Sequence, residues 1–209
     1  PIASSAASDV YKRQDLGLRT ASEVRTNGID IGSPIVYKPS AEVIGDEKIV
    51  GTSVDDRAGC AVLLEVARQI NSRAAGPEIN IVFTVQEEFN LRGALPVAQK
   101  IKPEIAIQID LLLASDTPDM RDFGEIKLGE GPGISMFSFH GRGTLNGVIP
   151  HPVLVKHFEQ AASKENINLQ KSAHIGALTD LSYVQLVENG VASIAVSYTH
   201  LTLPTRLLV

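Results

Sequence analysis

Apolar and polar positions alternate in two different rhythms along residues 49–197. Runs rich in β-branched residues, with the length and composition of buried strands, occupy residues 79–86, 105–109 and 191–197. Apolar positions at helical spacing separate these runs and predict helices at residues 59–73, 94–101, 150–164 and 181–188. Strands and helices that alternate in this way predict an α/β fold, specifically a three-layer α/β/α sandwich.

The helical spacing also predicts which side chains face the core. In the helix at 59–73 the apolar face comprises Val62, Leu63, Val66, Ala67 and Ile70. In the helix at 150–164 it comprises Val153, Val155, Phe158, Ala161 and Ala162. Residues 15–48 are instead rich in glycine, proline and β-branched residues, and they predict only a short helix at 21–26 and a strand at 34–38.

Acidic residues stand where the predicted strands end and where a predicted helix begins. Glu87 and Glu88 close the first apolar run, Asp110 closes the second, and Asp55 and Asp56 precede the helix at 59–73. In open α/β sheets such positions meet at one edge, which is where ligands bind. Burying several like charges together is costly unless a cation compensates them. The sequence therefore predicts a metal site.

Each acid also has an ordinary structural interpretation. Asp55 can cap the following helix, and Asp110 alone is a weak signal because strand-end aspartates are common in turns. A solvated acidic loop would explain the two glutamates but not the apolar run that leads into them. Asp116 is expected to be a turn acid before Thr117-Pro118, and Asp180 the N-cap of the helix at 181–188.

The ordered set of acidic blocks resembles a known family, the dinuclear-metal aminopeptidases of the glutamyl-aminopeptidase type (the tetrahedral, FrvX-like group). The resemblance extends from about residue 15 to about residue 197. It rests on the blocks at 54–65 (with Asp-Asp-Arg-Ala-Gly), 86–94 (with Gln-Glu-Glu), 109–110 with 116–118, 128–134 and 178–180. Paired glutamates alone occur across a wider clan of zinc peptidases and deacylases, whereas the Asp-Asp-Arg-Ala-Gly block is more specific.

The resemblance implies a site and a reaction. Asp55 would bridge two divalent metal ions, zinc or cobalt, and the peptide bond between Asp55 and Asp56 would be cis. Glu88 and Asp110 would be the other carboxylate ligands. Glu87 would be the general base that takes a proton from a water bridging the metals and delivers it to the leaving amine. The substrates would be peptides that lose their N-terminal residue. The whole protein would be a cytoplasmic homo-oligomer.

The resemblance also indicates what surrounds this segment. Residues 15–48 would be the end of an inserted small β-domain and residues 49–197 an incomplete catalytic domain. Residues 1–14 and 198–209 resemble translated sequencing-adapter DNA, so we expect them not to pack on the core. The family's two histidine ligands would lie outside the chain, which is therefore expected to be weakly active or inactive. The alternative functions are an N-acyl amino-acid deacylase of the same clan and a non-catalytic scaffold.

Composition narrows the possible partners. Hydrophobic residues make up 44% and charged residues 21% of the 209 positions, as in globular proteins. A net charge of −5 without a basic run argues against nucleic acid, and no apolar run is long enough for a membrane span. The single cysteine, Cys60, is expected to be a buried structural thiol, and Arg57 to pair with a carboxylate. The histidines at 140, 151, 157 and 174 are expected on the surface, and no ligand role is assigned to His200.

Overall fold

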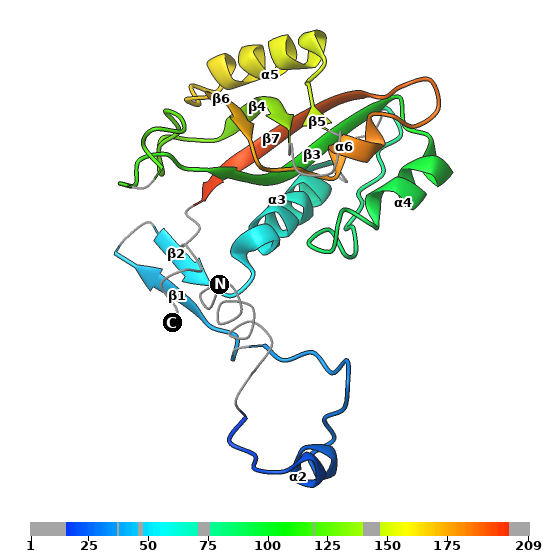
Figure 1. Cartoon of the computed structure of the whole chain (residues 1–209). Coiled ribbons are helices and arrows are strands. Elements are labelled where there is room, and N and C mark those ends of the chain that lie inside the picture. The colour runs from blue at the N-terminus through cyan, green and yellow to red at the C-terminus, as the bar shows by residue number, and fades with distance from the viewer. Residues whose placement is uncertain are drawn as a thin grey trace, which may run out of the picture. The chain divides into compact units, whose positions relative to one another are not determined.

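The structure is a computed structural model that divides into two compact units, one ending at Thr52 and the other beginning at Ser53. It describes residues 16–36, 38–45, 48–70, 76–118, 120–139 and 147–200, apart from the side chain of His200. Figure 1 shows the elements of both units, each of which is considered by itself below.

The first unit contains one short helix and one hairpin. Helix α2 (Ala21–Thr26) begins with a capping box: the Thr20 hydroxyl accepts from the Glu23 N–H, and the Glu23 carboxylate accepts from the Thr20 N–H, both at 3.2 Å. Strands β1 (Ala41–Ile44) and β2 (Lys48–Gly51) pair antiparallel. The helix predicted at 21–26 is confirmed. The strand predicted at 34–38 is wrong for its described residues, because the ladder forms between β1 and β2 instead.

The second unit is built on a mixed five-stranded sheet. Its strands are β3 (Ile105–Leu113), β4 (Gly133–Phe139), β5 (Gly147–Val148), β6 (Gln170–Ile175) and β7 (Ala192–His200). Strand β7 lies between β3, to which it is parallel, and β4, to which it is antiparallel. Strand β4 also pairs antiparallel with β5 and parallel with β6. Because β3 and β7 are parallel, their carboxyl ends reach the same edge of the sheet.

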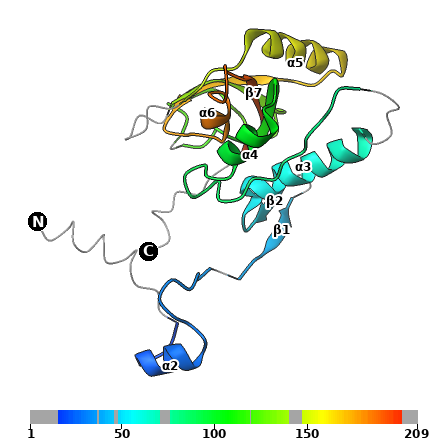
Figure 2. The same ribbon diagram turned by 90° about the vertical axis from the view of Figure 1, so that its right-hand side faces the viewer.

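Helices cover both faces of this sheet. The helices are α3 (Val54–Ile70), α4 (Ala94–Ile101), α5 (Pro152–Lys164) and α6 (Leu181–Val184). Ile194 of β7 packs with Val155 of α5, whereas the next residue, Ala195, belongs to the cluster formed with α4 and α6. Neighbouring strand residues point to opposite faces, so α5 covers one face and α4 and α6 the other, as Figure 2 shows. The three-layer prediction is confirmed.

Three helix predictions hold with changed ends or faces. Helix α3 begins before residue 59, at Val54, and Val62 and Val66 of its predicted inner face are exposed. In α5 the predicted inner position 153 is exposed, and Leu154 packs against the core instead. Helix α6 is a single turn that ends at Val184, four residues short of the predicted end, and irregular turns continue from there to Gly190, which has a positive φ of 98°.

The strand predicted at 79–86 is wrong, because these residues have no regular secondary structure. A strand needs a neighbouring backbone to pair with, and no described strand pairs with this segment, which leaves Phe83 48% and Val85 70% exposed. Strand β7, in contrast, extends beyond residue 197, since Tyr198, Thr199 and His200 pair with Leu111–Leu113 of β3. The expectation that the chain stops packing at 198 is therefore wrong for 198–200. Residues 1–14 and 201–209 lie outside the described residues.

Candidate metal centre

The Asp55-Asp56 pair lies at a kink at the start of α3. The peptide bond between the two residues is cis, as the resemblance implies, and both residues have non-helical dihedral angles. Asp56 Oδ1 accepts a 3.0 Å hydrogen bond from the Gly59 N–H, so Asp56 rather than Asp55 caps the regular part of the helix. A Cβ atom at position 59 would lie 2.4 Å from Asp56 Oδ1, which explains the glycine there. The capping interpretation of Asp55 is therefore wrong.

Three carboxylates from two distant segments meet beside this kink. One oxygen each from Asp55, Asp56 and Asp110 lie within 4.8 Å of one another. Asp110 is only 8% exposed, and its carboxylate accepts from the Leu111 N–H at 2.7 Å and from Gln108 Nε2 at 2.8 Å. Strand β3 continues past Asp110, so this acid lies within the strand rather than at its end as predicted. Within the described part of the chain, this cluster contains carboxylates only.

The acids of this cluster oppose one another's ionisation. Burial, followed by the charges of Glu88 and Asp56, raises the pKa of Asp55 to about 6. Burial raises the pKa of Asp110 to about 7, against a lowering hydrogen bond from Leu111 and with a further increase from Asp56 and Asp55. Carboxylates gathered in this way favour either a proton or a cation. The residues present therefore fit a divalent metal ion, because carboxylate oxygens are ligands for such ions.

The two glutamates lie on a tight turn next to the cluster. Gln86, Asn90 and Leu91 around them have positive φ angles of 57°, 68° and 58°. Such angles are uncommon for residues other than glycine and often occur at functional sites. Burial, followed by the charge of Asp110, raises the pKa of half-buried Glu87 to about 8. Glu88 is exposed, and although its charge raises the pKa of Asp55, it lies outside the three-carboxylate group.

The structure thus brings together Asp55 and Asp110 as predicted, and it places Glu87 close enough for its pKa to respond to both. It also brings in Asp56, to which the family resemblance gave no ligand role. Its position next to Asp55, directly before a helix, is the sequence feature that could have predicted its place in the cluster.

Asp180 is a further buried acid near the cluster, only 7% exposed. It occupies the N-cap position of α6 as predicted, but its side chain makes no capping hydrogen bond. Its Oδ2 atom instead accepts a 2.7 Å hydrogen bond from the Thr84 hydroxyl, while Oδ1 is buried without a hydrogen-bond partner among the described residues. Burial raises the pKa of Asp180, and its charge raises the pKa values of Asp56, Glu87 and Asp110.

Tyr198 reaches the cluster from the end of β7. Its hydroxyl donates to Asp56 Oδ1 at 2.9 Å and lies 3.1 Å from the Val54 carbonyl oxygen. Burial, followed by the hydrogen bond to Asp56, raises the pKa of this phenol above its usual value. This contact was not predicted from the sequence, because residues 198–209 were expected not to pack on the core.

Among the described side chains, no histidine joins the cluster of Asp55, Asp56 and Asp110. His151 and His157 are exposed, as predicted, and His151 Nδ1 accepts from the Val153 N–H at 3.3 Å. His174 is half-buried, which lowers its pKa, and its Nδ1 lies 3.3 Å from the Ser172 hydroxyl oxygen. The surface prediction is therefore wrong for position 174. Position 140 lies outside the described residues.

Three other side chains with predicted roles lie outside the carboxylate cluster. Arg57 is exposed and makes no ion pair with a described residue, so its expected pairing is wrong. Asp116 accepts a 3.2 Å hydrogen bond from the Leu128 N–H, which is consistent with a loop acid. Cys60 is a free, half-buried thiol.

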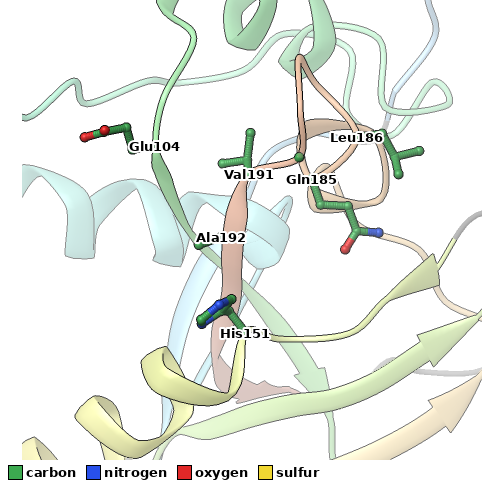
Figure 3. A pocket seen from close by; sticks show the side chains of 7 residues that line it. Glu104, His151, Gln185, Leu186, Val191 and Ala192 are labelled. Atoms are coloured by element: carbon green, nitrogen blue, oxygen red, sulfur yellow. The ribbon is translucent and has the colours of Figure 1, made fainter.

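A cavity lies at the opposite end of the sheet from the acids of the cluster. It has a volume of about 480 Å³ and is lined by Glu104, His151, Gln185, Leu186, Gly190, Val191 and Ala192. These residues surround the starts of β3 and β7, and in Figure 3 the Glu104 carboxylate points away from the other labelled side chains. A second cavity of about 310 Å³ is lined by residues of β4, β5 and α6. Neither contains an acid of the cluster, so charge rather than cavity volume identifies the candidate metal centre.

Comparison with known proteins identifies relatives over most of the chain. A family model described as M42 glutamyl aminopeptidase matches residues 9–203. The chain is 36% identical to SgcX of Escherichia coli (strain K12), over 89% of this chain and 51% of that protein. It is 30% identical to the lysyl aminopeptidase of Pyrococcus furiosus, over 89% of this chain and 51% of that enzyme.

Solved structures agree with the sequence relatives. Aminopeptidase APDkam598 from the archaeon Desulfurococcus kamchatkensis superposes with a TM-score of 0.79 at 31% identity, over 88% of this chain and 50% of that one. The chain spans about half the length of the relatives it matches. Among the described residues, no helix has both the length and the apolar character needed to cross a membrane.

Proposed function

We propose, from the premise that the chain belongs to the M42 glutamyl aminopeptidase family, that it forms part of the catalytic domain of a metal-dependent aminopeptidase. The observation that carries the proposal is the meeting of Asp55, Asp56 and Asp110 within 4.8 Å beside Glu87. A scaffold domain has no need to collect acids that raise one another's pKa values. The relatives named above include aminopeptidases, and no comparison supports the deacylase alternative.

The carboxylates would hold two divalent ions, for which zinc and cobalt suit the expected ligand chemistry. Asp55 would bridge the ions, Asp110 would bind one of them, and Glu88 would bind the other. Asp56 is less available to a metal ion, because its Oδ1 atom already accepts hydrogen bonds from the Gly59 N–H and the Tyr198 hydroxyl. These hydrogen bonds support Glu88 rather than Asp56 as the remaining ligand. When bound, such ions lower the pKa of a coordinated water and polarise a substrate carbonyl.

Glu87 would act as the general base. It is half-buried, and its pKa of about 8 arises from burial and from neighbouring acids in the absence of a cation. A nearby divalent charge would lower that pKa and leave the carboxylate ionised, able to accept a proton at neutral pH. The same carboxyl group would then return the proton to the amine that leaves. Glu87 therefore needs to lie beside the metal ligands without being one.

The proposal extends to the substrates, the oligomeric state and the cellular location of the whole protein. The relatives include lysyl and glutamyl aminopeptidases, which supports peptides as substrates and their N-terminal residue as the group removed. The TET1 peptidase of Pyrococcus horikoshii assembles into a tetrahedron or a large octahedral shell, and this supports a homo-oligomer for the whole protein. The single free cysteine is compatible with a cytoplasmic location.

Titration of the 209-residue chain with Co²⁺ tests the metal centre directly. We expect Asp55→Asn and Asp110→Asn each to weaken Co²⁺ binding at least about tenfold, because a neutral amide is a poor ligand for a dication. The matched control is Glu104→Gln in the cavity of Figure 3, which should bind Co²⁺ like the unmodified chain. Unchanged binding in both aspartate variants would contradict the proposed centre.

We propose to test activity in a version extended to the length of the relatives. In that version, release of the N-terminal residue from a short peptide should far exceed hydrolysis of an N-acetylated amino acid. The reverse preference would indicate a deacylase, and absence of both activities in a metal-loaded, folded protein would favour a scaffold.

A further inference from the structure

The corner that precedes α6 is hydrogen-bonded to both segments that carry the proposed site acids. The Thr84 hydroxyl donates to Asp180 Oδ2 at 2.7 Å, three residues before Glu87. On the other side, the Leu181 N–H donates to Gln108 Oε1 at 3.3 Å, and Gln108 Nε2 donates to Asp110 Oδ2 at 2.8 Å. The corner formed by Asp180 and Leu181 thus connects the glutamate turn to the strand that carries Asp110.

Asp180 and Leu181 are buried in the core, whereas residues 79–86, which Asp180 contacts through Thr84, are not part of the sheet. Leu181 is 2% exposed and belongs to the core cluster with Ala94 and Val184, and Asp180 is almost as deeply buried. Residues 79–86 have no ladder partner among the described strands. A buried charge-assisted hydrogen bond is among the stronger polar contacts in proteins. The contact between Thr84 and Asp180 therefore ties a segment outside the sheet to a buried part of the fold.

We propose that Asp180 is a positioning residue, which fixes the Glu87-Glu88 turn relative to Asp110 through its hydrogen bond with Thr84. This inference rests on the proposed metal centre. Asp180 does not cap α6, it is not one of the three clustered carboxylates, and its Oδ2 atom is engaged by Thr84. The role remaining for it is to orient groups that themselves bind the cation or move the proton. Residues that orient metal ligands typically change metal affinity or activity by about 10–100-fold when removed.

Matched substitutions on each side of the hydrogen bond distinguish positioning from direct ligation. Thr84→Val keeps the shape of the side chain but cannot donate, whereas Thr84→Ser keeps the hydroxyl. Asp180→Ala removes the acceptor, whereas Asp180→Asn keeps an oxygen that can accept from Thr84 but removes the charge. Asp110→Asn serves as the reference for loss of a ligand. Co²⁺ affinity of the 209-residue chain is measured for all five variants, together with the hydrogen-exchange protection of residues 79–90.

Positioning predicts a specific pattern. Thr84→Val and Asp180→Ala should each weaken Co²⁺ binding by about 10–100-fold and lower the protection of residues 79–90, while Thr84→Ser and Asp180→Asn should stay within about threefold of the unmodified chain. In the extended protein, Thr84→Val should lower kcat with little change in KM, because the peptide is bound but the base is misplaced.

The other outcomes overturn the inference in different ways. Equal loss of Co²⁺ binding in Asp180→Asn and Asp180→Ala would mean that Asp180 acts through its charge, as a ligand. Unchanged binding and protection in Thr84→Val, with binding lost in Asp110→Asn, would refute positioning but leave the metal centre intact. If Asp110→Asn also binds normally, the proposed centre itself is wrong. Thr84→Val keeps the test decisive if Asp180→Ala fails to fold.

Discussion

The two ends of the β3–β7 pair differ in a way that cavity volume does not reveal. At the starts of these strands lies the larger cavity, with an acid and a histidine on its wall, Glu104 and His151. Toward their carboxyl ends Asp55, Asp56 and Asp110 meet, and neither of the two cavities described above is lined by these acids. The first end has space and polar groups, and the second has charges that cannot easily coexist.

The difference lies in how the polar groups are satisfied. Glu104 is exposed to water, and His151 uses its Nδ1 atom to cap α5, so both have ordinary structural roles. Asp110 is buried and Glu87 is half-buried, and burial together with the charges of neighbouring acids raises their pKa values to about 7 and about 8. Groups whose pKa values are shifted by burial and like charges are often functional. Buried like charges, rather than cavity volume, therefore mark the candidate metal centre.

Glu87→Gln should have the largest effect on turnover, and it should contrast most clearly with Glu104→Gln at the other end of the β3–β7 pair. In the extended protein we expect turnover to fall by roughly 10²–10⁴-fold, because the amide cannot accept the proton. Metal content, measured by elemental analysis, should hardly change, since Glu87 is not expected to be a ligand. Glu104→Gln should leave turnover unaltered. Full activity in Glu87→Gln would refute its role, and loss of metal would mean that Glu87 and Glu88 have exchanged roles.

Gly93→Ala should have the next largest effect, through the segment that bears the glutamates. A Cβ atom at position 93 would lie 2.3 Å from the Val85 carbonyl oxygen, so the backbone of one segment must move. Overpacking of this kind costs typically about 1–3 kcal/mol of folding free energy, measurable by urea unfolding. Co²⁺ affinity should fall as well, because Val85 directly precedes the glutamate turn.

The matched control is Gly76→Ala, where a Cβ atom would meet nothing within 4 Å. Its free energy of unfolding should stay within about 0.5 kcal/mol of the unmodified chain. An equally small change in Gly93→Ala would show that the turn is not held by its contact with Val85.

The smallest effect is a pH dependence of stability in the chelated chain. Asp55, Asp110 and Glu87 have folded-state pKa values of about 6, about 7 and about 8, all above their ordinary values. A group whose pKa is raised by folding stabilises the protein fully below its unfolded pKa and loses that contribution as pH rises through the folded pKa. The melting temperature in EDTA should therefore fall between about pH 4 and pH 8.

Two comparisons check this pH dependence. Saturating Co²⁺ should flatten the fall at its upper end, because a bound dication favours the ionised carboxylates. Asp110→Asn should flatten it without metal, since one buried acid is gone. A melting temperature that rises over the same pH range in EDTA would contradict the assigned burial of these acids.

Much of this arrangement could be predicted from the sequence. Apolar periodicity placed helices close to α3, α4 and α5, and the acids that follow or precede apolar runs identified Asp55, Glu87 and Asp110. Periodicity reports which side chains seek burial, but it does not say which backbone will pair with which. The apolar run at 79–86 therefore predicts a strand, although these residues pair with no described strand. Strand β7 likewise continues to His200, three residues past the predicted end at residue 197.

The contacts that could not be predicted are those between side chains far apart in the sequence. The hydrogen bond from Thr84 to Asp180 joins residues 96 positions apart, and that from Tyr198 to Asp56 joins residues 142 positions apart. An acid before a helix is statistically a cap, so Asp180 was assigned to α6. Only the folded chain shows that its carboxylate faces Thr84 and that Asp56 takes the capping role on α3.

The assembly of the centre from separate segments has a consequence for how the protein survives in solution. Asp55, Glu87 and Asp110 come together only when α3, the glutamate turn and β3 are all in place. An unfolded chain offers only scattered carboxylates, so a cation that binds the folded form alone shifts the folding equilibrium by mass action. At a free concentration one hundred times its dissociation constant, such an ion adds about 2.7 kcal/mol to stability. Metal supply would then govern resistance to proteolysis and storage lifetime as well as chemistry.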